Sequence, residues 1–210
     1  MGDIGDKSAI PAVELALQNE KTKDTSAIVL SKLKTPKGKE LILVLLKSDK
    51  DSEKLDGLSK LDSTTSNLAG SGQKDCEKKI TDILSEEEVR KALFYLTDDK
   101  NTDVRRKAFQ LLYRLLAYID MGRAKDEPHP LREILIEGLF IPTILKGIND
   151  PDEEIQLLML TACFIAHGDG PDCIKRRFYT PEVSKAIKSK LESPNQGIRT
   201  WAAQVIKSQE

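Results

Sequence analysis

A recurring helical unit constrains the fold of this chain more than any other feature of its sequence. Each unit has an acidic or proline-containing turn, then a β-branched residue, then small or apolar residues near positions i+3/4, i+7 and i+8. That spacing places the apolar side chains on one stripe of an amphipathic helix. The β-branched residues Val104, Ile155 and Ile198 are 51 and then 43 residues apart. Such a period suits a pair of helices joined by loops of variable length.

Each of these helices has a partner helix before it and a short polar turn between the two. The turns contain Asp150-Pro151 and Ser193-Pro194, and proline is tolerated in the first turn of a helix but not in its interior. Pro142 should therefore kink or divide its helix. Helix, short turn and helix in repetition predict an α-solenoid. The partner helices are expected over residues 87–96, 131–148 and 181–191.

The N-terminal part repeats the pattern, with helices expected over residues 9–17, 24–33, 40–47 and 55–61. A run rich in Gly and Ser follows, and it has too few apolar side chains to order itself. We predict an all-α, right-handed solenoid of antiparallel helix pairs with about four to five degenerate repeats. Its parts are N-terminal pairs over residues 1–62, a flexible loop over residues 63–74 and C-terminal pairs over residues 75–210.

The first residues carry a more specific motif. The run Gly2-Asp3-Ile4-Gly5-Asp6, followed by Ala9-Ile10-Pro11-Ala12-Val13, resembles the phycobilisome-lyase type of HEAT-like repeat. The run from Asp103 to Ala108 matches the Asp-x-Val-Arg-x-x-Ala pattern of HEAT helices, and the resemblance covers most of residues 1–61 and 86–208. It implies a HEAT/armadillo-like solenoid. It also implies that residue 1 falls inside a repeat, so we expect either a truncated array or self-association through an uncapped N-terminal end.

Charge and composition exclude several classes of protein. The chain has 33 basic and 34 acidic residues, so no global field attracts nucleic acid or an anionic membrane. The longest aliphatic run, residues 41–46, is too short to span a bilayer. The three cysteines have no CxxC spacing, which predicts reduced, mostly buried thiols in a cytoplasmic protein rather than a disulfide framework or zinc site.

Catalytic signatures are missing from the sequence. The only histidines, His129 and His167, are not followed by Glu, so the His-Glu pairs of the HEAT-like deoxyhypusine hydroxylases are absent. There is no Gly-rich phosphate loop and no local nucleophile–base signature. Trp201 is expected in the core. We therefore expect no enzyme, no cofactor and no metal site.

Local charge is the remaining signal. Residues 175–190 contain six basic residues and one acidic residue, with two aromatic residues between them. We favour the interpretation that these charges are solvated faces of amphipathic helices. The resemblance to HEAT-like repeats implies that Arg105 pairs with an acidic turn residue of a neighbouring unit, Asp150 or Asp152. The candidate binding surface comprises Arg105, Arg106, Lys175, Arg176, Arg177, Tyr179, Lys185 and Lys188.

These observations favour a non-catalytic scaffold that binds a peptide or partner protein along the groove of the solenoid. The helices over 40–47, 87–96, 131–148 and 181–191 are expected to line that groove. The alternative is a nucleic-acid-binding protein that uses the basic surface of residues 175–190.

Overall fold

The computed structural model describes residues 11–12, 15, 36–65, 80–120, 140–165 and 179–208. Within these residues the regular structure is helical throughout. The helices are α3 (Pro36–Leu46), α4 (Asp51–Thr65), α6 (Glu87–Leu96), α7 (Thr102–Asp120), α9 (Phe140–Ile148), α10 (Glu153–Ile165), α12 (Pro181–Ser189), the 3-10 turn η4 (Lys190–Glu192) and α13 (Gln196–Lys207).

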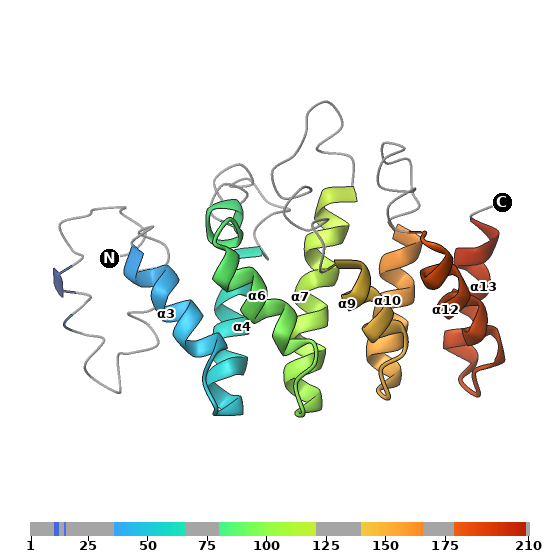
Figure 1. Cartoon of the computed structure of the whole chain (residues 1–210), viewed down its shortest axis with the longest axis horizontal. Coiled ribbons are helices and arrows are strands. Elements are labelled where there is room, and N and C mark those ends of the chain that lie inside the picture. Colours follow the sequence, from blue (N-terminus) through green and yellow to red (C-terminus); the bar gives the residue numbers. More distant parts are fainter. Residues whose placement is uncertain are drawn as a thin grey trace.

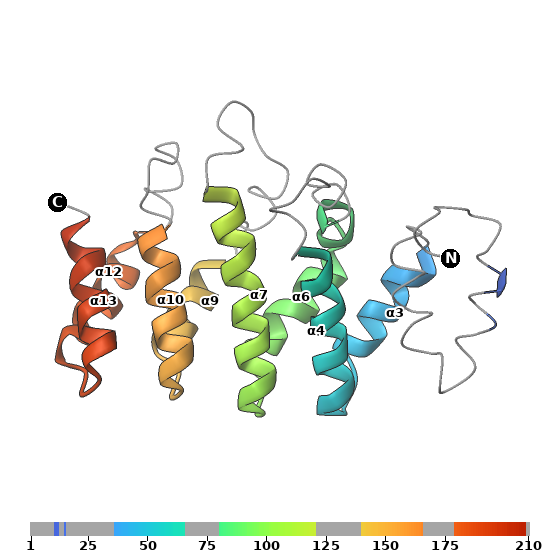
Figure 2. The ribbon, with the colours of Figure 1, turned by 180° about the vertical axis from the view of Figure 1, so that it is seen from behind.

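The helices form four consecutive pairs that stack side by side in two layers (Figure 1). The second helices of the pairs, α4, α7, α10 and α13, each pack against the next and form one layer, the α4 layer. Figure 2 shows this layer as a row of roughly upright helices. The first helices, α3, α6, α9 and α12, form the α3 layer behind it. This arrangement is the expected solenoid of antiparallel helix pairs.

Apolar side chains at the expected positions hold each pair together. The β-branched residues Val104, Ile155 and Ile198 are all buried. The residues four positions later (Ala108, Met159 and Ala202) and seven positions later (Leu111, Ala162 and Val205) are buried as well. They belong to one core cluster that runs from Ile42 in α3 to Val205 in α13. Burial of this stripe is the main force that holds one pair on the next.

Asparagine side chains in the turns before α7 and α13 cap these two helices. The Asn101 Oδ1 accepts hydrogen bonds from the backbone nitrogens of Asp103 and Val104, at 2.9 and 3.4 Å. The Asn195 Oδ1 accepts from Gly197 and Ile198, at 2.8 and 3.2 Å. Caps of this kind satisfy backbone donors that have no partner within the helix. They explain why α7 and α13 begin where the polar turns end.

Several predicted boundaries differ from the structure. α3 begins at Pro36, earlier than the predicted residue 40, and α4 continues to Thr65, so the predicted loop starts three residues too early. α6 has the predicted bounds, whereas α12 ends at Ser189 and continues as η4. The described part of the expected helix 131–148 begins at Phe140, with Pro142 in the first turn, where proline is tolerated.

Other predictions concern residues that the structure does not describe, including the N-terminal helices over 9–17 and 24–33 as wholes and most of the loop over 63–74. The division into two halves stays a prediction. α4 packs against α7 and α3 against α6, so the described helices on either side of that loop share one core.

Cys163 is buried, and burial raises the pKa of its thiol to about 12, in agreement with the expectation of a buried thiol. Cys76 and Cys173 lie outside the described residues. Among the described helices, none combines the length and apolar character that a bilayer crossing requires.

Candidate binding surface

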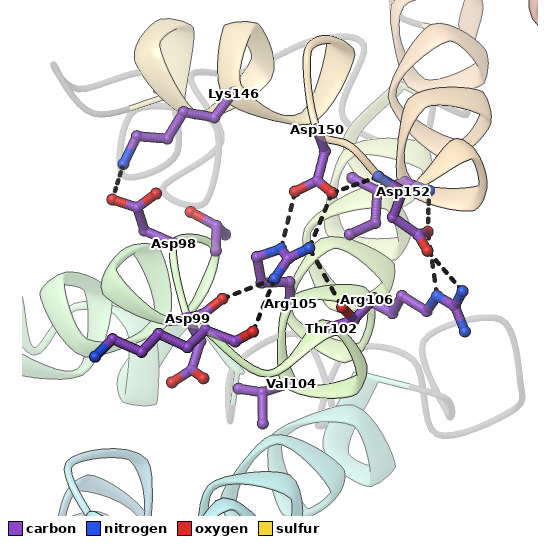
Figure 3. Close-up of polar contacts among 12 residues, drawn as sticks. Asp98, Asp99, Thr102, Val104, Arg105, Arg106, Lys146, Asp150 and Asp152 are labelled. Atoms are coloured by element: carbon purple, nitrogen blue, oxygen red, sulfur yellow. Dashed lines mark hydrogen bonds and ion pairs between the residues drawn. The ribbon is translucent and has the colours of Figure 1, made fainter.

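The turns within the helix pairs lie along one edge of the stack (Figure 1), and Arg105 joins two of them (Figure 3). Its Nε and Nη2 donate to the Asp150 carboxylate at 2.9 and 3.2 Å. Its Nη1 donates to the backbone carbonyls of Asp99 and Lys100 in its own turn, at 2.9 and 3.3 Å. The side chains of Arg105 and Asp150 are only 12% and 7% exposed. The pairing of Arg105 with Asp150, one of the two partners expected from the sequence, is confirmed.

Arg106 forms a second ion pair across the same junction. Its Nε and Nη2 donate to the two carboxylate oxygens of Asp152 at 3.1 and 2.6 Å, and its Nε also lies 3.0 Å from the Glu154 carboxylate. The hydrogen bond from Arg106 lowers the pKa of Asp152 below its usual value. Arg105 and Arg106 of the sequence-based candidate surface therefore join the α6–α7 pair to the α9–α10 pair.

The lowered pKa of Asp152 predicts a pH-dependent effect of Arg106→Gln. The folded pKa lies below the unfolded value of 3.8, so the pair stabilises the fold above that value and loses its effect as the pH falls through the folded pKa. At about pH 7 the variant should unfold at lower urea concentration than the wild type. At a pH well below 3.8 the difference should shrink. An equal difference at both pH values would show that the charge on Asp152 contributes nothing.

The other junctions reveal the register of the repeats. The Lys54 Nζ lies 2.8 Å from the Asp99 carboxylate. Lys54 therefore links the α3–α4 pair to the α6–α7 pair, just as Arg105 links the α6–α7 pair to the α9–α10 pair. The last junction has Gln156 and Ser193 at the positions of Arg105 and Asp150. A charged pair is thus replaced by two neutral residues. There, the Asn195 Nδ2 donates to the Glu153 carboxylate at 2.7 Å.

This register exposes a row of neutral polar side chains that the sequence analysis missed. Counting six residues from Val104, Ile155 and Ile198 reaches Gln110, Thr161 and Gln204. In α4, Glu53 precedes Lys54 as Val104 precedes Arg105, and six residues on is Ser59. We call Ser59, Gln110, Thr161 and Gln204 the polar row. The sequence alone could have identified Gln110, Thr161 and Gln204 by their equal distance from the β-branched residues. Ser59 is identified only through the Lys54–Asp99 contact, which aligns α4 with the other repeats.

Helix geometry puts the polar row on the outer surface of the α4 layer. At about 100° per residue, a position six residues after the anchor lies nearly opposite the buried stripe. Ser59, Gln110 and Gln204 are exposed and Thr161 is half-buried. The Thr161 hydroxyl donates to the Leu157 carbonyl at 2.8 Å. The side chains of the other three make no hydrogen bond within the described residues, so each layer helix offers a polar side chain at the same height.

An aromatic strip runs beside the polar row. Tyr113 and Phe164 occupy the same repeat position, three residues after Gln110 and Thr161. Phe164 is 39% exposed, and its ring meets that of Trp201 edge to face with centroids 5.6 Å apart. Trp201, in α13, is half-buried and packs against the core cluster, so it lies at the edge of the core in which it was expected. This part of the surface can pack against an apolar side chain.

Among the remaining residues of the sequence-based candidate surface, the described ones do not join the polar row. The Tyr179 hydroxyl donates to the Cys163 carbonyl at 2.6 Å. Lys185 and Lys188 are exposed on α12, in the other layer. Lys175, Arg176 and Arg177 lie outside the described residues.

A cleft of about 800 Å³ opens between the α3–α4 turn and α6. Its walls are strongly charged, but most of the charges are paired: Lys47 with Glu88 at 2.6 Å and Lys54 with Asp99 at 2.8 Å. The exposed Tyr95 lies on its rim. Within the part of the chain that is described, no group of three or more His, Cys, Asp or Glu residues can hold a metal ion. His129 and His167 are outside that part.

Comparisons with known proteins show similarity of fold. No family model matches the chain, and no curated protein matches it in sequence. A designed armadillo repeat protein, solved in complex with the peptide (KR)4, superposes with a TM-score of 0.69 over 96% of this chain and 81% of its own, at 14% identity. Two engineered proteins give TM-scores of 0.64 and 0.62, both at 16% identity, over 95% and 99% of this chain and 78% and 88% of theirs. The chain thus has the armadillo-like α-solenoid fold, and the predicted fold class is confirmed. The phycobilisome-lyase type is not.

Proposed function

We propose that this chain is a non-catalytic scaffold that binds an extended peptide segment of a partner protein across the α4 layer. The polar row carries this proposal. A peptide in extended conformation has unpaired backbone N–H and C=O groups along its length, and amide side chains both donate to and accept from such groups. Gln110 and Gln204 have this chemistry, and Ser59 offers a hydroxyl on a neighbouring helix. The armadillo fold supports the proposal, since a designed protein of that fold was solved with a bound peptide.

The spacing of the helices sets the length of the bound segment. Packed helices lie about 8–10 Å apart, so the axes of α4 and α13 are about 24–30 Å apart across three intervals. An extended chain advances about 3.3 Å per residue. The polar row therefore matches a segment of about eight residues.

This proposed placement of the groove differs from the sequence-based expectation that α3, α6, α9 and α12 line it. The exposed charges of α6 and α9 are largely paired, as in Lys91 with Glu87 at 2.7 Å and Lys146 with Asp98 at 2.8 Å. A peptide would have to displace these contacts. The free polar side chains of the α4 layer need no such displacement.

Substitution of the polar row tests the proposal. We expect an array of eight-residue peptides to contain binders of the wild-type protein. The double variant Gln110→Ala/Gln204→Ala should bind them about tenfold more weakly, because each lost hydrogen bond contributes about 0.5–1.5 kcal/mol. Its stability should stay within about 0.5 kcal/mol of wild type, since both side chains are exposed. Fluorescence anisotropy measures the binding.

The matched control is Lys185→Ala/Lys188→Ala, which changes two exposed side chains of α12 in the other layer. It should leave peptide binding unchanged. Binding that survives loss of both glutamines, or falls equally in the control, would contradict the proposal. The same control tests the nucleic-acid alternative, which expects retention on heparin at low salt that depends on these lysines.

A further inference from the structure

Positive charge is concentrated at one end of the proposed groove, and this position indicates which side chains the bound segment carries. Asp62 of α4 is 8% exposed and receives two cations from α7. The Lys107 Nζ lies 2.7 Å from one carboxylate oxygen, and the Arg114 guanidinium pairs with the other. Neither Lys107 nor Arg114 has another acidic partner within the described residues. The three residues therefore leave an excess of one positive charge at the α4–α7 seam.

Arg114 presents this excess charge to the groove. Its side chain is 48% exposed, and it follows Gln110 by one helical turn on the same helix. Arg106, one turn before Gln110, lies instead among the carboxylates of Asp103, Asp152 and Glu154. The neighbourhood of Arg114, and not that of Arg106, therefore complements a negative charge.

The opposite end of the groove is apolar. At the α10–α13 seam the partly exposed Phe164 ring lies against Trp201, and Leu157 on the same stretch of α10 is half-buried. A large apolar side chain placed there would shed water from its own surface and from both rings. Two helix intervals, about 16–20 Å, separate the two seams. An extended chain covers that distance in about five or six residues, and only the even spacing of about six places both side chains on the same face of the chain.

We propose that the segment bound across the α4 layer carries an acidic side chain over Lys107 and Arg114 and a large apolar side chain over Phe164 and Trp201, about six residues apart. This inference rests on the proposed function and adds the chemistry that selects the partner. An acidic side chain gains a charge-assisted contact with the guanidinium, whereas a basic side chain at that position is repelled.

Four sets of dye-labelled eight-residue peptides with a Ser/Ala background test this inference. The first carries Glu and Phe six residues apart, so that both face the same side of an extended chain, in both orders along the chain. The others replace Glu with Gln, Glu with Lys, or Phe with Ala. Anisotropy gives the affinities, and the emission of Trp201, the only tryptophan, reports occupancy of the apolar end.

For the wild-type protein we expect the Glu peptide to bind about tenfold more tightly than the Gln peptide and the Lys peptide to bind most weakly. Arg114→Gln should abolish the preference for Glu over Gln, and Arg114→Lys should retain most of it. Phe164→Ala should remove only the preference for Phe over Ala. Lys188→Gln, which removes one positive charge from the other layer, is the matched control and should change neither preference. Circular dichroism verifies the fold of each variant.

Equal binding of the Glu and Gln peptides to the wild type, or tighter binding of the Lys peptide, would overturn the inference and leave the proposed function standing. Equal binding of the Phe and Ala peptides would overturn it in the same way. If none of the peptides binds, the inference fails, and the absence of binders on the wider array would then reject the proposed function as well. Arg114-dependent binding of single-stranded DNA without peptide binding would overturn both.

Discussion

Replacing Phe109 with alanine is expected to lower the free energy of unfolding by about 3–5 kcal/mol. Phe109 is fully buried on α7, at the middle of the stack. Removal of its ring loses the transfer free energy of the apolar atoms and leaves a cavity between neighbouring pairs, which a packed interior refills only in part. Urea unfolding followed by circular dichroism measures the loss. A cost below about 1 kcal/mol would contradict the packing described for α7.

Gly147 lies beside Phe109, so adding a side chain there tests the same packing in the opposite direction. A Cβ added to Gly147 would lie 2.7 Å from the Phe109 Cε1 and 2.3 Å from the Met159 Cγ, so α9 approaches α7 and α10 closely only because this residue has no side chain. Gly147→Ala should cost about 1–3 kcal/mol through overpacking. Combined with Phe109→Leu, it should cost less than the sum of the single changes, since the smaller side chain makes room. Strict additivity would mean that the two residues are not in contact.

Asp150→Ala is expected to cost about 3–5 kcal/mol. Asp150 is 7% exposed and accepts two hydrogen bonds from the guanidinium of Arg105, whose own side chain is 12% exposed. Loss of the carboxylate leaves a largely buried cation without its partner, and this penalty dominates when one member of a buried pair is removed. It also removes the hydrogen bond from the Asp152 backbone nitrogen, at 2.9 Å. Urea unfolding at neutral pH measures the cost.

Asp98→Ala is the control for this change. Asp98 also forms an inter-unit ion pair, with Lys146 at 2.8 Å, but the side chains of Asp98 and Lys146 are 65% and 48% exposed. Exposed pairs contribute about 0–1 kcal/mol, so this substitution should have little effect. If Asp150→Ala and Asp98→Ala lower the free energy of unfolding equally, burial of the Arg105–Asp150 pair does not account for its contribution to stability.

The sequence predicted the helices and one ion pair because these depend on local patterns. Apolar spacing located α7, α10 and α13 through Val104, Ile155 and Ile198, and the repeat pattern indicated that Arg105 pairs with the next turn. Boundaries were less certain: Ser63 to Thr65 remain helical although their composition is typical of a loop. The polarity of a short segment does not show whether a helix continues through it, because packing against neighbouring helices also decides where a helix ends.

The candidate site is formed by contacts between residues far apart in the chain, and local sequence patterns do not reveal such contacts. Lys107 and Arg114 reach Asp62 across 45 and 52 residues. The membership of Ser59 in the polar row depends on Lys54 contacting Asp99, because the α4 repeat has Glu53 in place of a β-branched residue. The sequence-based candidate surface selected Arg105 and Arg106 for their charge, yet both charges are paired within the stack.

Photocrosslinking with a bound eight-residue peptide tests most directly which layer forms the binding surface. A photoreactive phenylalanine analogue is placed at Gln110 or Gln204 in the α4 layer, or at Tyr95 or Lys188 in the α3 layer. All four side chains are exposed, so the substitutions should be tolerated. The account predicts crosslinks from Gln110 and Gln204 and none from Tyr95 and Lys188. Crosslinks from Tyr95 or Lys188 with none from the glutamine positions would contradict it.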